Sequence, residues 1–114
     1  MKYLLLVLIS FHIFAADINE KNIYHLHQSI GYMEEYSDGR CPNGLQRATN
    51  HLSSIKKPTK LLKPIIQGVK IALKKGKSVT KSDAESLRFH IQGVIDKTIK
   101  KHPDSWHKEF RACL

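Results

Sequence analysis

The sequence lacks the patterns that usually mark an enzyme. It contains no G-x-S-x-G nucleophile motif, no H-E-x-x-H metal motif and no glycine-rich phosphate loop. Its adjacent acidic residues, Glu34 and Glu35, would point apart on a helix, so they do not form a two-carboxylate site. We therefore expect a protein that is not an enzyme.

Metal-binding patterns are absent as well. His25 and His27 are two residues apart, which would place them on different faces of a helix. Cys41 and Cys113 are too far apart for the C-x₂₋₄-C pattern of a zinc site. We expect no metal and no other cofactor.

The histidines are then expected to be exposed polar side chains, with His90 and His107 at the edges of the core. The alternative is a small nuclease with a ribonuclease-like site built from His51, His90 and nearby lysines. No spacing in the sequence selects those residues for such a site.

The chain has no hydrophobic run long enough for a transmembrane helix, which needs roughly 20 residues. Its first 16 residues, MKYLLLVLISFHIFAA, instead have the basic, apolar and small-residue parts of a signal peptide. We predict a signal peptide at 1–16 and a single domain at 17–114, exported to the periplasm or secreted. The alternative for 1–16 is a first core helix.

Cysteine is scarce, and both cysteines, Cys41 and Cys113, fall within the predicted mature chain. In an exported chain an even number of cysteines indicates disulfide bonding. One intramolecular pairing is possible, and it would close a loop of about 72 residues and contribute about 4 kcal/mol. Two free thiols or an intermolecular bridge are the alternatives.

Alternating strand patterns are nearly absent, and helical spacing dominates. The first helix is expected to bury one face of Ile23, Leu26, Ile30 and Met33, and the third an apolar stripe of Leu62, Ile65, Ile66, Val69, Ala72 and Leu73. CPNG (41–44) is expected to be a turn, because Pro fixes one φ and Gly frees another. A first helix is expected from a cap at Asp17 to a stop at Gly39, a second up to Pro58, and a third from Thr59 or Pro64 to Gly76. A fourth is expected from a capping box of Ser82 and Glu85. A short fifth helix after Pro103 would turn Trp106, Phe110 and Cys113 inward. The sequence predicts an all-α, compact bundle of four to five helices closed by one disulfide.

Acidic residues are missing from a long part of the chain, although the formal net charge is +9. Between Arg40 and Ser82 there are no Asp or Glu residues. In the part of the predicted mature chain that precedes this block, acidic residues predominate, and Lys21 is the one Lys or Arg among them. A basic block of this kind indicates either a solvated face or a surface for an acidic partner. The lysines that we predict to bind a partner are Lys56, Lys57, Lys60, Lys63, Lys70 and Lys74.

Aromatic residues are also missing from the basic block, and this narrows the class of partner. Nucleic acid is disfavoured because the block offers no ring on which bases can stack. An interfacial membrane helix usually carries Trp or Phe at its apolar edge, and 56–77 has neither. An acidic exported protein is the partner that we expect, with an anionic lipid or wall polymer as the alternative.

Two stretches resemble a known family. IGYMEEYSDGRCPNGLQ (30–46) and VTKSDAESLRFHIQGVIDKTIKKHPDSWHKEFRAC (79–113) are similar to parts of the small periplasmic immunity proteins of the Rap/Tai type. Members of that family neutralise peptidoglycan amidases delivered by type VI secretion. The resemblance covers about half of the predicted mature chain and implies a helical, disulfide-linked, exported inhibitor of a cell-wall hydrolase or toxin.

Overall fold

A computed structural model describes the backbone of residues 2–98 and the side chains of residues 20–98. Within this range the chain forms α1 (Lys2–Ser37), α2 (Gly44–Ser53), α3 (Lys63–Lys74), the short 3₁₀ helix η1 (Gly76–Ser78) and α4 (Lys81–Thr98), and no strand. The all-α prediction is confirmed. The expected fifth helix lies outside the described residues.

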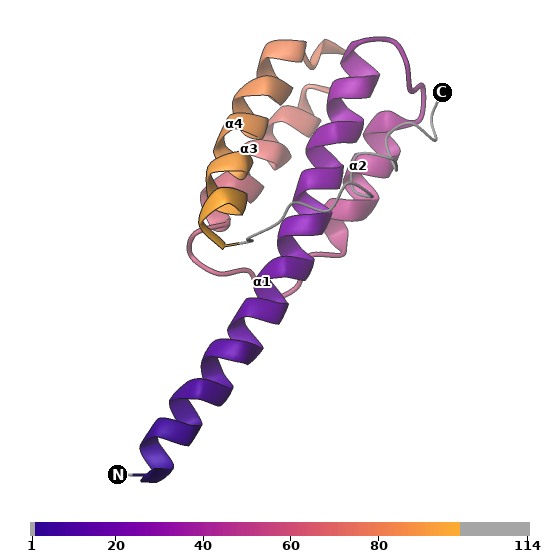
Figure 1. Ribbon diagram of the computed structural model, residues 1–114. Coiled ribbons are helices and arrows are strands. Elements are labelled where there is room, and N and C mark those ends of the chain that lie inside the picture. Colours follow the sequence, from indigo (N-terminus) through magenta and orange to yellow (C-terminus); the bar gives the residue numbers. More distant parts are fainter. Residues whose placement is uncertain (1, 99–114) are drawn as a thin grey trace.

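The long helix α1 is the centre of the fold. Its C-terminal half packs most extensively against α2 and α4, and α3 closes the bundle against α4, whereas the N-terminal half of α1 projects past the other helices (Figure 1). Four residues at helical spacing, Ile23, Leu26, Ile30 and Met33, are at most 1% exposed and lie at the heart of the core. The predicted apolar face of the first helix is confirmed.

The start of the first helix was predicted wrongly. α1 runs without a break from Lys2, so Asp17 lies inside it and does not cap it. The physical reason is that no proline or glycine occurs before Gly31, so nothing in the sequence interrupts the helix at residue 17. Among the described helices, none is both long and apolar enough to cross a membrane.

The end of α1 follows the prediction. Gly39 adopts a left-handed φ of 77°. Its N–H bonds to the Tyr36 carbonyl at 3.0 Å, and the Arg40 N–H bonds to the Glu35 carbonyl at 2.9 Å. These two bonds form a Schellman motif, which satisfies carbonyls that the helix leaves open and turns the chain toward α2.

The turn at 41–44 is confirmed, but its glycine has a different role from the one expected. The Gly44 N–H bonds to the Cys41 carbonyl at 3.0 Å, which closes the turn. Gly44 is not among the residues of positive φ; it allows close contact between α2 and α1. A Cβ built on Gly44 would lie 2.5 Å from the Tyr32 carbonyl oxygen and 2.7 Å from the Tyr36 Cβ.

Helix α2 ends earlier than predicted, at Ser53 and not near Pro58. Near this end, the Ser53 and Ser54 hydroxyls donate to the carbonyls four residues back, a competition that weakens a helix end. The backbone of Lys56 is then bonded to the side chain of Asn22 on α1, so it cannot continue the helix. Tertiary contact, not the proline, sets this boundary.

Helix α3 agrees with the prediction that it begins around Pro64. Pro64 lies in the first turn, where a missing N–H leaves no hydrogen bond unmade. The predicted core stripe is buried at Leu62, Ile65, Ile66 and Val69. Gly76, with φ of 56°, ends the helical segment as expected.

The capping box of α4 lies two residues before the predicted pair of Ser82 and Glu85. The Thr80 Oγ1 accepts the Asp83 N–H at 3.1 Å, and the Thr80 N–H donates to Asp83 Oδ2 at 3.0 Å. Both pairs fit the pattern of a short polar residue followed three positions later by an acid. Val79 is 6% exposed, and its burial places the turn so that Thr80 becomes the cap.

Substitution at the two candidate caps separates these assignments. Thr80→Ala is expected to lower the free energy of unfolding by about 1 kcal/mol, because an orphan helix N–H loses its acceptor. Ser82→Ala, the matched control, is expected to change it by less than about 0.5 kcal/mol. Urea unfolding followed by circular dichroism measures both, and a larger loss for Ser82→Ala would contradict the Thr80 cap.

Acid should weaken the same cap. The Thr80 backbone N–H, and then the Lys75 ammonium, lower the pKa of the Asp83 carboxyl from 3.8. A carboxyl whose folded pKa is depressed stabilises the protein above its unfolded pKa, and this contribution is lost as the pH falls through the folded value. We expect Asp83→Asn to flatten the loss of stability below about pH 4, measured as urea midpoints. An unchanged acid profile would contradict this assignment.

Candidate functional site

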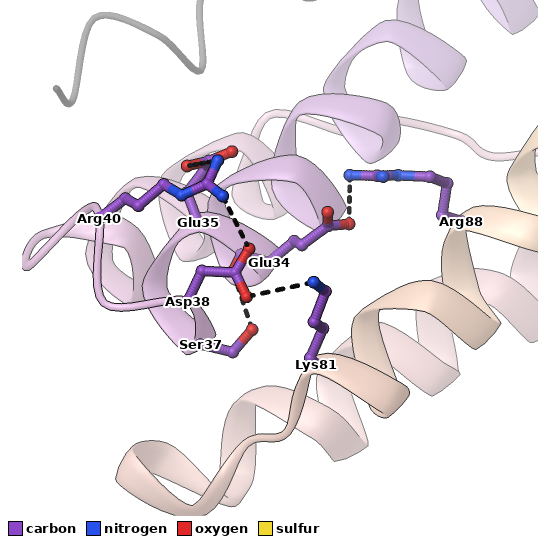
Figure 2. A network of polar contacts seen from close by, with 7 residues as sticks. All are labelled: Glu34, Glu35, Ser37, Asp38, Arg40, Lys81 and Arg88. Atoms are coloured by element: carbon purple, nitrogen blue, oxygen red, sulfur yellow. Dashed lines mark hydrogen bonds and ion pairs between the residues drawn. The ribbon is translucent and has the colours of Figure 1, made fainter.

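The acidic residues at the end of α1 are neutralised within the fold. Glu34 pairs with Arg88 of α4, Asp38 pairs with Lys81 at 3.7 Å, and Arg40 lies 3.8 Å from Glu35 and 3.9 Å from Asp38 (Figure 2). These carboxylates oppose the helix dipole at a C-terminus, and the surrounding cations compensate for this. α4 and the turn after α1 supply their partners, so these acids are paired in space although charge is polarised along the sequence.

The basic block is thereby divided into two groups. Arg40 and Lys81 pair with the end of α1, and Lys75 lies 3.0 Å from Asp83. The other group forms no ion pair with any carboxylate of residues 20–98; all its lysines are exposed, and Arg47 is half-buried. It includes all six lysines predicted to bind a partner: Lys56, Lys57, Lys60, Lys63, Lys70 and Lys74.

Three of these lysines form a stripe on α3. Lys63, Lys70 and Lys74 are separated by seven and four residues, which places them on one face of the helix. The opposite face of α3 is buried in the core. We call the exposed stripe of Lys63, Lys70 and Lys74 the lysine face.

Apolar side chains lie beside the lysine face. Ile71 is 54% exposed and stands three residues before Lys74, so the two are neighbours on the helix surface. Leu61, just before α3, is 51% exposed. Protein interfaces gain affinity from apolar side chains that become buried among charges on binding, so Ile71 is a candidate contact, and the sequence patterns did not single it out.

Lys56 and Lys57 lie apart from the lysine face, at a pocket between α1 and the α2–α3 connection. The pocket has a volume of about 670 Å³ and is lined by Lys21, Asn22, His25, Ser53, Ser54, Lys56 and Lys57. The structure thus places five of the six lysines at two sites, and Lys60, in the turn before α3, belongs to neither. The sequence reasoning missed Lys21, Asn22 and His25 here, because the helix pairing that brings them to residues 53–57 leaves no mark in the local pattern.

Asn22 holds one wall of this pocket in place. Its side chain is buried, with its Nδ2 donating to the Lys56 carbonyl at 2.9 Å and its Oδ1 accepting the Lys56 N–H at 3.2 Å. One amide therefore satisfies both backbone groups of a residue 34 positions away. Asn22 lies at the edge of the apolar face of α1, and its buried amide is satisfied by a segment that only the fold brings near.

Loss of this clamp should destabilise the protein. Asn22→Ala leaves the N–H and the carbonyl of Lys56 without these partners, and we expect a loss of about 2 kcal/mol in the free energy of unfolding. Asn50→Ala, at an exposed position of α2, is the control and should change it by less than about 0.5 kcal/mol. Thermal unfolding measures both variants, and equal effects would contradict the clamp.

A cluster of rings joins α1 to α2 next to the pocket. His25 Nδ1 lies 3.1 Å from His51 Nδ1, and the His51 ring stacks on Tyr32 with centroids 5.7 Å apart. The Arg47 guanidinium lies over the Tyr32 ring at 5.5 Å, a cation–π contact. His51 is thus paired with His25, and the ribonuclease-like pairing of His51 with His90 gains no support.

The histidines differ from the expectation in their burial. His27 is 5% exposed, and His25 and His51 are half-buried, whereas His90 is exposed and not at a core edge. His107 lies outside the described residues. No group of three or more His, Cys, Asp or Glu residues that could hold a metal occurs in the described part of the chain.

Cys41 is buried beside Tyr32 and Ala48, at the turn that follows α1. Its N–H bonds to the Glu35 carbonyl at 3.2 Å, which fixes the residue against the end of α1. Cys113 lies outside the described residues. The pairing of Cys41 with Cys113 therefore stays a prediction.

No protein-family model, no curated protein and no solved structure matches this chain.

Proposed function

We propose that this chain is an exported, non-enzymatic helical protein that binds an acidic exported protein and inhibits it. The observation that carries the proposal is the lysine face with Ile71 beside it. The acids at the end of α1 are engaged with Arg40, Lys81 and Arg88, so they are not available to neutralise these lysines. An exposed positive face steers an acidic partner toward the protein, and an apolar side chain at its edge adds affinity.

The proposal includes the predicted processing of the chain. Residues 1–16 would be removed as a signal peptide, and a Cys41–Cys113 bridge would then close the domain in an oxidising compartment. The buried, fixed position of Cys41 supports a structural role for its sulfur. In this proposal the similarity to Rap/Tai-type immunity proteins points to a cell-wall hydrolase or toxin as the partner.

An acidic protein fits the lysine face better than a membrane does. Residues 56–77 contain no aromatic side chain, and the apolar stripe of α3 is buried in the core. A helix that binds the membrane interface needs a broad apolar face free to enter the acyl boundary. Ile71 and Leu61 offer isolated apolar side chains, which suit a pocket on a protein.

Co-purification tests the proposal directly. The tagged chain is expressed in its own cells, and the periplasmic or secreted fraction is passed over affinity resin at low salt. We expect one acidic protein to be retained and to be released by salt, because salt screens exposed charges. Retention of no protein would contradict the proposal, and salt-sensitive sedimentation with anionic vesicles in its place would favour the lipid alternative.

A further inference from the structure

We propose that the pocket between α1 and the α2–α3 connection binds a phosphate group. This pocket is distinct from the lysine face. Three lysines, Lys21, Lys56 and Lys57, line it together with His25, and no acidic residue among the described ones lines it. Ser53 and Ser54 add hydroxyl groups, which can donate hydrogen bonds to phosphate oxygens. This is the chemistry of an anion site.

The charge balance favours an anion although α2 ends at the pocket. The C-terminus of a helix carries about half a negative charge, which repels an anion. The three lysines carry three full positive charges at the same place. The lysines therefore outweigh the helix end, and they would repel a metal cation from the paired nitrogens of His25 and His51.

The wall that carries Lys56 and Lys57 is held in a defined conformation. Asn22 bonds both the N–H and the carbonyl of Lys56. Lys57 has a φ of 50°, the left-handed region that residues other than glycine rarely adopt. Strained backbone of this kind persists where the surrounding structure fixes it, and it concentrates at ligand-binding segments. The two ammonium groups thus start from a fixed backbone, which lowers the entropy cost of binding.

The size of the pocket indicates that the phosphate belongs to a larger molecule. A volume of about 670 Å³ lies within the usual range for sites that hold small organic ligands. An inorganic phosphate ion would fill only a part of it. The remainder can hold the alcohol part of a phosphate monoester, which is either a soluble metabolite or a lipid head group.

An NMR titration of the purified full chain at fixed ionic strength tests this site. The probes are inorganic phosphate, glycerol 3-phosphate and vesicles that contain phosphatidic acid. We expect saturable shifts of the Lys21, His25, Lys56 and Lys57 amides. Binding of glycerol 3-phosphate assigns a soluble ligand, and binding of the vesicles alone assigns a lipid head group. No saturable response to any probe up to about 10 mM phosphate, a free energy of less than about 3 kcal/mol, would overturn the proposal.

A matched pair of variants separates this pocket from general charge attraction. The double variant Lys56→Gln and Lys57→Gln should weaken binding at least about tenfold, because it removes two charged donors. The double variant Lys70→Gln and Lys74→Gln removes the same charge from the lysine face and should change the affinity for the phosphate probe less than about twofold. Equal losses of affinity in the two double variants would overturn the proposal that this pocket binds phosphate. The spectrum of each variant shows whether it folds, and a failure of the partner proposal leaves this comparison unaffected.

Discussion

Replacing Gly44 with alanine should lower the free energy of unfolding by about 3 kcal/mol. The new methyl group would meet the Tyr32 carbonyl oxygen at 2.5 Å and the Tyr36 Cβ at 2.7 Å. Both atoms belong to α1 next to its backbone, so they cannot move aside as the end of a flexible side chain could. α2 would have to shift away from α1, which would disturb the contacts around Cys41 and Ala48.

A second glycine provides the control. Gly93 lies inside α4 with no atom within 4 Å of a built Cβ. Gly93→Ala should therefore raise the free energy of unfolding by about 0.5–1 kcal/mol, the helix preference of alanine over glycine. Denaturant unfolding of both variants gives the comparison. A Gly44→Ala protein as stable as the wild type would show that α1 and α2 do not approach as closely as described.

Reversing the charge of the lysine face should slow the capture of the partner by a factor on the order of 100 at low salt. The change is the triple variant Lys63→Glu, Lys70→Glu and Lys74→Glu. These side chains form no ion pair with residues 20–98, so their reversal should leave the fold intact. Association and dissociation rates with the co-purified partner, measured by surface plasmon resonance, give the result.

Single variants sharpen this prediction. Lys70→Glu should slow association about tenfold, while Lys97→Glu on α4 makes the same charge change away from the lysine face and should alter it less than about twofold. Ile71→Ser should act on the dissociation rate, because an apolar contact contributes to affinity after docking. If Lys70→Glu and Lys97→Glu slow association equally, the overall charge of the protein, and not the lysine face, sets the association rate, which would contradict the prediction.

The helices were largely predictable from the sequence because their apolar residues recur at helical spacing. Ile23, Leu26, Ile30 and Met33 were expected on one face, and all four are buried. The boundaries were less predictable. α2 ends where Asn22 takes the backbone of Lys56, and the cap of α4 depends on a buried Val79, so both depend on contacts between distant residues.

The candidate site was predicted only in part, for the same reason. The sequence marked the basic residues, but the distinction between paired and exposed ones depends on which acids lie near them in space. Arg40 and Lys81 form ion pairs with Asp38, whereas Lys63 and Lys70 do not. The pocket beside Lys56 arises from the packing of α1 against the end of α2, which local spacing does not encode.

Amide hydrogen exchange of the protein with and without its co-purified partner tests the central claim most directly. We predict that the partner slows exchange in residues 60–74, which carry the lysine face, Leu61 and Ile71. Protection confined to α2 or to the outer face of α4, with 60–74 unchanged, would contradict the claim that the lysine face binds the partner.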